Sequence, residues 1–173
     1  IDPETGAERI PWDYKPRLWQ GHPLLYDVNH WTEDELFRVG TVDAIWRETQ
    51  AGMDALLARC GMTRDGHLYR CDNNQPDTIV LFCHFGIMMA CIGHLLGVSP
   101  MLLWHGFCTQ PSSVTTLVSE ECVVGEVVFR CMQSGDLSHL YAADEPYSTA
   151  ALFPECYTGR DSTDPPEWDA LGY

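Results

Sequence analysis

The sequence predicts an α/β fold that is organised around one strand–turn–helix unit. Residues 78–83 form a short, continuous, β-rich apolar run, which is typical of a strand buried on both faces. After His84 the apolar residues follow helical spacing as far as Gly97, which stands where a glycine commonly ends a helix. In such a unit the strand end and the first N–H groups of the helix face one crevice, where an anion can bind. We therefore expect a phosphate or carboxylate site at His84.

Composition limits the class of protein and its partners. The chain has 173 residues, of which 45% are hydrophobic, and this suits one globular domain or most of one. Ten basic and 25 acidic residues give a formal net charge of −15, which argues against a nucleic-acid partner. No window reaches the roughly 18 uncharged apolar residues of a membrane span, so we also expect no membrane partner.

Eight cysteines are present, but their spacing favours neither a disulfide framework nor a metal site. There is no Cys-x-x-Cys pair, and the intervals are irregular. Cys83, Cys91 and Cys131 lie inside apolar stretches, where a free cysteine behaves as a small hydrophobic residue. We therefore expect reduced thiols in a cytoplasmic protein, with no metal and no other cofactor. A module that binds a metal through scattered Cys and His side chains is an alternative, but it has less support than the two functions considered below.

The first forty residues are rich in proline and aromatic side chains. Pro11, Pro16 and Pro23 exclude one long regular helix. Aromatic residues at this density need cover from water, so we expect residues 1–40 to pack as a lid or insertion that walls a pocket. The candidate wall residues in this segment are Tyr14 and Arg17. For Arg17, an exposed charge that lies along apolar surface is the alternative interpretation.

The middle of the chain predicts one clear helix. Apolar residues at three- and four-residue steps indicate an amphipathic helix over residues 41–60. Thr41 is placed to cap its beginning and Gly61 to follow its end. Residues 67–70 are expected to form a short strand, and the polar stretch 72–77 a loop.

The remainder predicts a short helix, a hairpin and a tail. Pro100 suits the start of a short helix, in which Trp104 and His105 are further candidate wall residues. β-branched residues predict strands at 113–119 and 123–131, joined as a hairpin. From about residue 142 to 173 the chain is expected to be an acidic tail with local contacts only.

The seven histidines can be divided into structural and functional candidates by the residues around them. Three lie in polar or turn contexts typical of surface residues: His22, His30 and His67. His94 lies on the apolar helix, where a hydrogen-bonded core histidine is the common outcome, and His139 favours a structural hydrogen bond. The sequence holds no His-Glu-x-x-His, Gly-x-Ser-x-Gly, P-loop or Gly-x-Gly-x-x-Gly pattern. His84 is therefore the main candidate, although a structural role is the alternative on its position alone.

Residues 78–86 (Thr-Ile-Val-Leu-Phe-Cys-His-Phe-Gly) resemble the second-histidine motif of the histidine phosphatase superfamily, the phosphoglycerate mutase-like phosphatases. In that family an apolar strand ends in a histidine and runs into a helix that ends Leu-Leu-Gly, as at 95–97 here. Residues 112–117 resemble the family's later strand, and residues 136–140 its closing Asp-x-Ser-His-Leu. The matches cover about 78–141 in the family's order, and as a set they are specific.

The resemblance implies a three-layer sandwich, with a mostly parallel central sheet flanked by helices, that is incomplete in this chain. It implies three regions: a lid or insertion at 1–40, the C-terminal part of the α/β domain at 41–141, and the acidic tail at 142–173. The central parallel strands of the family belong to an upstream half. We therefore expect these 173 residues to be the C-terminal part of a longer protein.

The activity implied by the resemblance is phosphomonoester hydrolysis or mutase-type phosphoryl transfer through a phosphohistidine, on a small phosphorylated substrate. By matching, His84 is the family's second histidine, which donates to a phosphate oxygen, and the backbone N–H of Phe85 helps to hold the same group. The nucleophile motif Arg-His-Gly is absent, since no Arg-His dipeptide occurs here. The 173 residues alone are therefore expected to be inactive. The alternative is a non-catalytic module that binds phosphorylated ligands. The identity of the substrate and the oligomeric state stay open.

Overall fold

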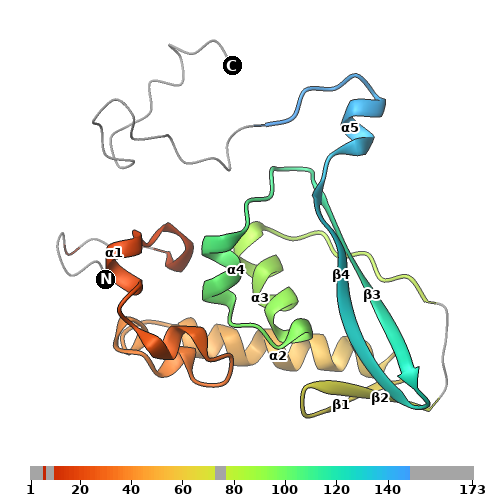
Figure 1. Cartoon of the computed structure of the whole chain (residues 1–173), viewed down its shortest axis with the longest axis horizontal. Coiled ribbons are helices and arrows are strands. Elements are labelled where there is room, and N and C mark those ends of the chain that lie inside the picture. The colour runs from red at the N-terminus through yellow and green to blue at the C-terminus, as the bar shows by residue number, and fades with distance from the viewer. Residues whose placement is uncertain (1–5, 7–9, 73–76, 149–173) are drawn as a thin grey trace. The chain divides into compact units, whose positions relative to one another are not determined.

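The computed structural model describes residue 6, residues 10–72 and residues 77–148. By its internal contacts the chain forms two compact units: Ile1–Phe107 with Thr116–Met132, and Cys108–Thr115 with Gln133–Tyr173. The described residues form helices and one four-stranded sheet (Figure 1), which confirms a mixed α/β class. Among these residues no helix is long and apolar enough to cross a membrane.

Short helices of one turn make up residues 10–40. The elements are η1 (Pro11–Asp13), α1 (Pro16–Trp19), η2 (Pro23–Tyr26), η3 (Trp31–Glu33) and η4 (Glu35–Phe37). Each of the three prolines opens one of these turns, because proline is tolerated at the start of a helix and breaks its interior. The expectation that no long helix forms here is confirmed. The assignment of residues 1–40 as a lid stays a prediction.

Three helices carry the core of the first unit: α2 (Val42–Ala58), α3 (Phe85–Leu96) and α4 (Pro100–Gly106). All three are at the positions that the sequence predicts, and α3 packs against both α2 and α4 (Figure 1). Gly97 ends α3 with φ 67°, in the left-handed region where glycine avoids a steric penalty. Most of the buried side chains from these helices and from residues 10–40 form one cluster, which includes Trp31, Trp46, Met89, Met101 and Trp104.

The sheet has the strand order β1-β2-β4-β3. Its strands are β1 (Met62–Asp65), β2 (Leu68–Cys71), β3 (Val114–Val123) and β4 (Glu126–Asp136). β1 pairs antiparallel with β2, and β2 pairs antiparallel with β4, with Tyr69 opposite Val127. β3 and β4 form the predicted hairpin, with its turn at Val124-Gly125 rather than at 120–122.

The mostly parallel sheet expected from the resemblance is not found among the described residues. Two-residue connections at Gly66 and Gly125, both with positive φ, join β1 to β2 and β3 to β4. Connections this short produce antiparallel pairs, whereas parallel strands need a crossover of a dozen or more residues. Residues 77–84, which lead into α3, pair with no strand that the structure describes.

Residues 77–84 are extended but form no strand, so the prediction of a buried strand at 78–83 is wrong for the described structure. Four large apolar side chains are exposed: Ile79 (38%), Val80 (68%), Leu81 (51%) and Phe82 (98%). No hydrogen bond joins the backbone of 78–83 to any residue that the structure describes. A strand needs a neighbouring backbone for its N–H and C=O groups, and none of the described segments supplies one.

The second unit contains α5 (Ser138–Ala142). The carboxylate of Asp136 accepts hydrogen bonds from the backbone N–H of Ser138 (3.1 Å) and from its hydroxyl (2.7 Å), and these bonds lower the pKa of Asp136. The backbone N–H of Gly135 donates to the Thr115 hydroxyl at 3.2 Å. Most of the predicted acidic tail, from residue 149 onward, lies outside the described residues.

Candidate functional site

His84 stands at the corner where the extended stretch enters α3. It is the N-cap residue of that helix, with φ −100° and ψ 160°, and its carbonyl accepts the backbone N–H of Met88 at 2.9 Å. The residue is exposed, and its ring forms no hydrogen bond with any described residue. An imidazole in this position is available to a ligand in solvent.

The first turn of α3 leaves its backbone donors open. No side chain caps this end of the helix, and its first turn has no acidic residue. The N–H groups of Phe85, Gly86 and Ile87 therefore lack intrahelical acceptors, as at every helix start. Together with the partial positive charge at the N-terminus of a 12-residue helix, they favour an anion. The Phe85 side chain packs against the core cluster, which leaves its backbone N–H at the corner.

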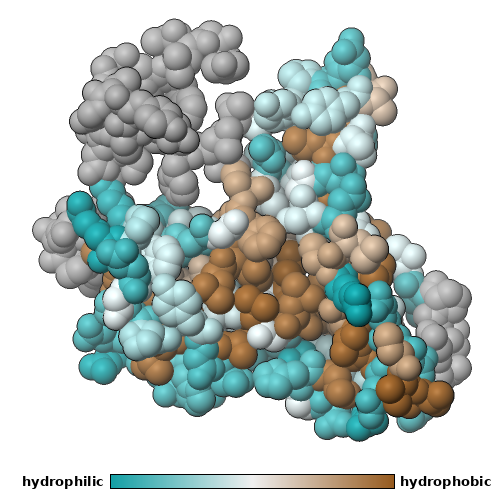
Figure 2. Space-filling view, in the orientation of Figure 1, coloured by the Kyte–Doolittle hydropathy of each residue, from teal (hydrophilic) through white to brown (hydrophobic). Residues whose placement is uncertain are grey.

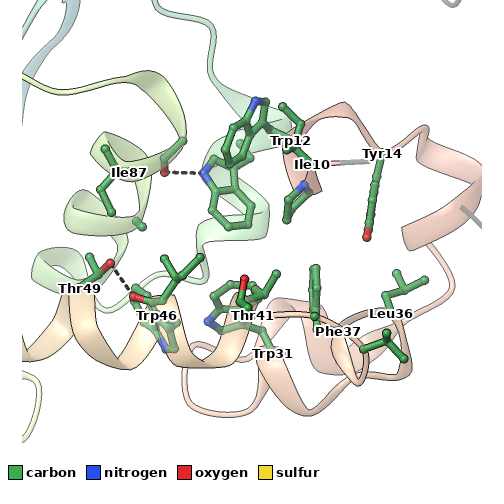
Figure 3. Close-up of a pocket in the computed structure, with 18 residues that line it drawn as sticks. Ile10, Trp12, Tyr14, Trp31, Leu36, Phe37, Thr41, Trp46, Thr49 and Ile87 are labelled. Carbon is green, nitrogen blue, oxygen red and sulfur yellow. Dashed lines mark hydrogen bonds between the residues drawn. The ribbon is translucent and has the colours of Figure 1, made fainter. Parts of the chain in front are cut away.

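Two tryptophans hold this corner in place. The indole N–H of Trp104 donates to the carbonyl of Gly86 at 2.9 Å (Figure 3). A Cβ at Gly86 would clash with the ring of Trp12, so only glycine leaves room for that ring at this position. The beginning of α3 is thereby fixed by contacts with α4 and with η1.

An apolar cavity of about 500 Å³ borders the same turn of α3. Figure 3 shows Tyr14 and Phe37 on one side of it, Ile87 and Trp46 on the other, with Trp12 above. The rings of Tyr14 and Phe37 are stacked, with centroids 6.1 Å apart. Tyr14 and Trp104, both candidate wall residues from the sequence, line this cavity, whereas Arg17 and His105 are not among its lining residues.

His105 has a structural position instead. Its Nε2 lies 3.1 Å from the carbonyl oxygen of Pro11, to which it donates, and its ring stacks on Trp19 with centroids 4.7 Å apart. Burial lowers the pKa of His105, which keeps the imidazole neutral near pH 7. His105 therefore connects α4 to η1 through the hydrogen bond to Pro11 and to α1 through the contact with Trp19.

A partly buried polar network at the other end of α3 was not predicted from the sequence. Nε2 of His94 and the hydroxyl of Tyr69 both donate to Oδ1 of Asp54, each at 2.7 Å. Arg64 donates to the Tyr69 hydroxyl (3.0 Å) and to the carbonyl of His94 (3.1 Å). The sequence predicts a hydrogen-bonded core histidine at His94, and this is confirmed by its 4% exposure. Its partners lie 25 to 40 residues from His94 along the chain, so no local pattern could reveal them.

The electrostatics of this network follow from its burial. Burial lowers the pKa of His94, assisted by the positive charge of Arg64 and opposed by Asp54. Burial and the hydrogen bond to Asp54 raise the pKa of Tyr69 to about 12. The network borders a polar cleft of about 490 Å³ and joins α2, α3, β1 and β2. Because its donors and acceptors are paired with one another, its main effect is to fix α3 on the rest of the unit.

Metal chemistry finds no support in the described part of the chain. No group of three His, Cys, Asp or Glu side chains is arranged there to hold a metal ion. Seven cysteines are described and all are free thiols; burial raises the pKa of Cys91 to about 11. Comparison of the chain with protein-family models, curated proteins and solved structures finds no match to any of them.

Proposed function

We propose that this chain forms the phosphate-binding corner of a histidine phosphatase-type enzyme, a phosphomonoester hydrolase or a mutase. The observation that carries the proposal is the exposed imidazole of His84 at the uncapped N-terminus of α3. The ring and the N–H groups of Phe85 and Gly86 offer several donors from one corner. Phosphate oxygens are the acceptors that such a group of donors suits best.

In this proposal His84 is a phosphate-binding residue and not the nucleophile. Its ring N–H donates to a non-bridging oxygen and stabilises the charge that develops on the phosphoryl group. A second imidazole, from outside the 173 residues, attacks phosphorus while the bond to the leaving oxygen breaks. Water then cleaves the phosphohistidine, which releases inorganic phosphate.

The proposal includes the fold that the resemblance implies. Residues 78–83 become an internal strand of a mostly parallel sheet when strands from outside the 173 residues pair with them. The apolar side chains of this run are exposed in the described chain, among them Phe82 at 98%. An internal strand of a three-layer sandwich would bury such side chains on both faces.

A non-catalytic module that binds phosphorylated ligands is the second candidate. The absence of any Arg-His dipeptide in the sequence favours it. Both candidates bind phosphate at the His84 corner. If the second is correct, the natural protein binds phosphorylated ligands but does not hydrolyse them.

The test is hydrolysis of p-nitrophenyl phosphate by the natural protein and its His84→Ala variant. We expect kcat/KM to fall by at least about 100-fold, the size of effect seen when a transition-state donor is removed. The melting temperature should change little, because the His84 ring bonds to no described residue. The control is His67→Ala, an exposed histidine in the β1–β2 turn, which should leave the rate unchanged.

Each outcome decides between the candidates. A His84→Ala rate within threefold of the parent would contradict the assignment of the site. Phosphate binding without any turnover in the natural protein would favour the non-catalytic module. The 173-residue chain by itself is expected to bind phosphate but not to hydrolyse the ester.

A further inference from the structure

The cavity beside α3 has an unusual lining for so acidic a chain. Its 18 lining residues include no Asp, Glu, Lys, Arg or His, although the whole chain has a formal net charge of −15. Six of them are aromatic: Trp12, Tyr14, Trp31, Phe37, Trp46 and Trp104. Figure 2 shows that apolar residues gather on one face where α3 lies in Figure 1. A volume of about 500 Å³ is within the range of small-molecule sites.

The walls offer few polar groups to a ligand: the buried indole N–H of Trp31 has no partner among the described residues, whereas two other groups are engaged. The Trp104 indole N–H donates to Gly86, and the Thr49 hydroxyl donates to the carbonyl of Ile45 at 2.7 Å (Figure 3). A ligand with many hydroxyl or charged groups would lose its hydration here and find too few partners to replace it. The lining therefore selects an uncharged, apolar group.

The arrangement of rings favours a flat aromatic group over an aliphatic one. The Trp31 ring makes edge-to-face contacts with three neighbours, Phe37, Trp46 and Trp104, with centroids 5.2, 5.6 and 5.5 Å apart. Aromatic rings prefer such edge-on or offset contacts, and a further ring in the cavity can adopt them with the walls.

The cavity also lies close to the proposed phosphate corner. Gly86 and Ile87 line it, and they belong to the turn of α3 that directly follows His84. One helical turn rises about 5.4 Å, so a phosphate at the helix N-terminus is about one turn from the cavity wall. A phosphomonoester can span this distance when its leaving group is a ring.

We infer that the cavity binds the aromatic part of an aryl phosphomonoester whose phosphate is held at His84. This inference rests on the proposed function and names its substrate class. The ring provides binding through buried apolar area, and the phosphate provides orientation. Sugar phosphates and other polyhydroxylated esters are excluded from the cavity by the same lining.

The test measures binding to the 173-residue chain by calorimetry with three main probes, 1-naphthyl phosphate, inorganic phosphate and 1-naphthol, and with glycerol 2-phosphate as a control ester. We expect 1-naphthyl phosphate to bind at least about tenfold more tightly than inorganic phosphate, since the buried ring adds hydrophobic binding. Glycerol 2-phosphate, with a polar alcohol, should show no such gain.

A pair of variants localises the effect. Ile45 lines the cavity and is 51% exposed, so Ile45→Glu places a charge at its wall without disturbing the core. This variant should weaken 1-naphthyl phosphate and 1-naphthol by about tenfold and leave inorganic phosphate unchanged. The control is Leu102→Glu on α4, which is 37% exposed and outside the lining, and it should change none of the three.

The results separate the inference from the proposed function. Inorganic phosphate that binds while the naphthyl group adds no affinity would overturn the inference alone. Equal weakening of all probes by Ile45→Glu would overturn it as well. A third outcome is that inorganic phosphate does not bind, while 1-naphthol binds and Ile45→Glu weakens it. This result would contradict the phosphate site at His84 and show that the cavity binds aromatic groups but not aryl phosphomonoesters.

Discussion

At the scale of single residues, two histidines on one helix have opposite environments. His84 begins α3 exposed, with no described partner, whereas His94 near its end is buried and bonded to Asp54 at 2.7 Å. A buried polar group without partners would be costly, so the position of His94 depends on its network. The exposed imidazole of His84 needs no partner within the protein, because water can bond to its ring nitrogens, and it is available to bind a ligand.

The lowered pKa of His94 predicts a pH dependence of stability. Its pKa in the folded state is below the unfolded value of about 6.5, so the unfolded chain binds the proton first as the pH falls. Stability from this group is therefore complete above about pH 6.5 and is lost as the pH drops towards the lowered folded pKa. Urea unfolding of the parent at pH 7, 6 and 5 should show this loss.

His94→Gln isolates the contribution of that histidine. The amide can still donate to Asp54 but does not titrate, so the variant should lose less stability between pH 7 and pH 5 than the parent. The difference grows by about 1.4 kcal/mol for each unit of pKa lowering. Other titrating groups, such as the exposed His30–Asp27 pair, are common to both proteins and cancel. Parallel stability curves would show that His94 is not buried as a neutral base.

Residue chemistry was predictable from the sequence only where it depends on local context. The N-cap position of His84 and the buried helix position of His94 both follow from neighbouring residues. The partners Asp54, Tyr69 and Arg64 come from three other elements, and their distance along the chain hides them. The structural bond of His105 to Pro11, 94 residues away, was hidden for the same reason.

At the scale of elements, glycines decide where α3 can end and what it can pack against. Gly97 has φ 67°, and the backbone N–H groups of Gly97 and Val98 both bond to the carbonyl of Gly93. A Cβ at Gly93 would lie 2.6 Å from the carbonyl oxygen of Val98. The end of the helix is therefore specified at two positions, by conformation at Gly97 and by space at Gly93.

Three Gly→Ala variants test this account by chemical unfolding. Gly97→Ala should cost about 1–2 kcal/mol, because alanine is disfavoured in the left-handed region. Gly93→Ala should cost at least as much, since the backbone of the turn must move. Gly52→Ala is the control: it lies in the exposed interior of α2 with open space around it, and it should add about 0.5–1 kcal/mol of stability. A neutral Gly97→Ala would contradict the argument from conformation.

The elements themselves were largely predictable, with informative exceptions. The limits of α2, α3 and α4 follow from apolar spacing and from Pro100 and Gly97. β1, with the sequence Met-Thr-Arg-Asp, was missed because it lacks both apolar alternation and β-branched density. The β3–β4 turn falls at Val124-Gly125 because Gly125 adopts φ 78°, and that conformational preference outweighs the polar character of residues 120–122.

At the scale of the whole molecule, the main difference between the sequence prediction and the structure lies in residues 78–83, which lead directly to His84. A β-rich apolar sequence predicts a buried strand only when other strands lie beside it. The described strands all belong to an antiparallel sheet made from local hairpins and the β2–β4 pair, and none pairs with this run. The pattern expresses a strand preference of the segment, and the structure leaves the segment exposed because no described strand pairs with it.

This exposure predicts rapid exchange and poor solubility of the 173-residue chain. Backbone amides of residues 79–83 should exchange with solvent at rates near those of an unfolded peptide, while those of α2 and α3 are protected. Replacing Leu81 and Phe82 with serine should raise the solubility of the chain without lowering its melting temperature, because both side chains are exposed. Slow exchange of these amides in the isolated chain would show that the run is already paired.

The central claim is that the His84 corner binds phosphate, and NMR titration of the 173-residue chain with inorganic phosphate tests it most directly. We expect saturable shifts confined to the His84 ring and to the amides of Phe85, Gly86 and Ile87, with affinity at least about tenfold weaker in His84→Ala, since a charge-assisted donor is lost. Shifts that are absent, that spread over the surface without saturating, or that are unchanged in His84→Ala would contradict the claim.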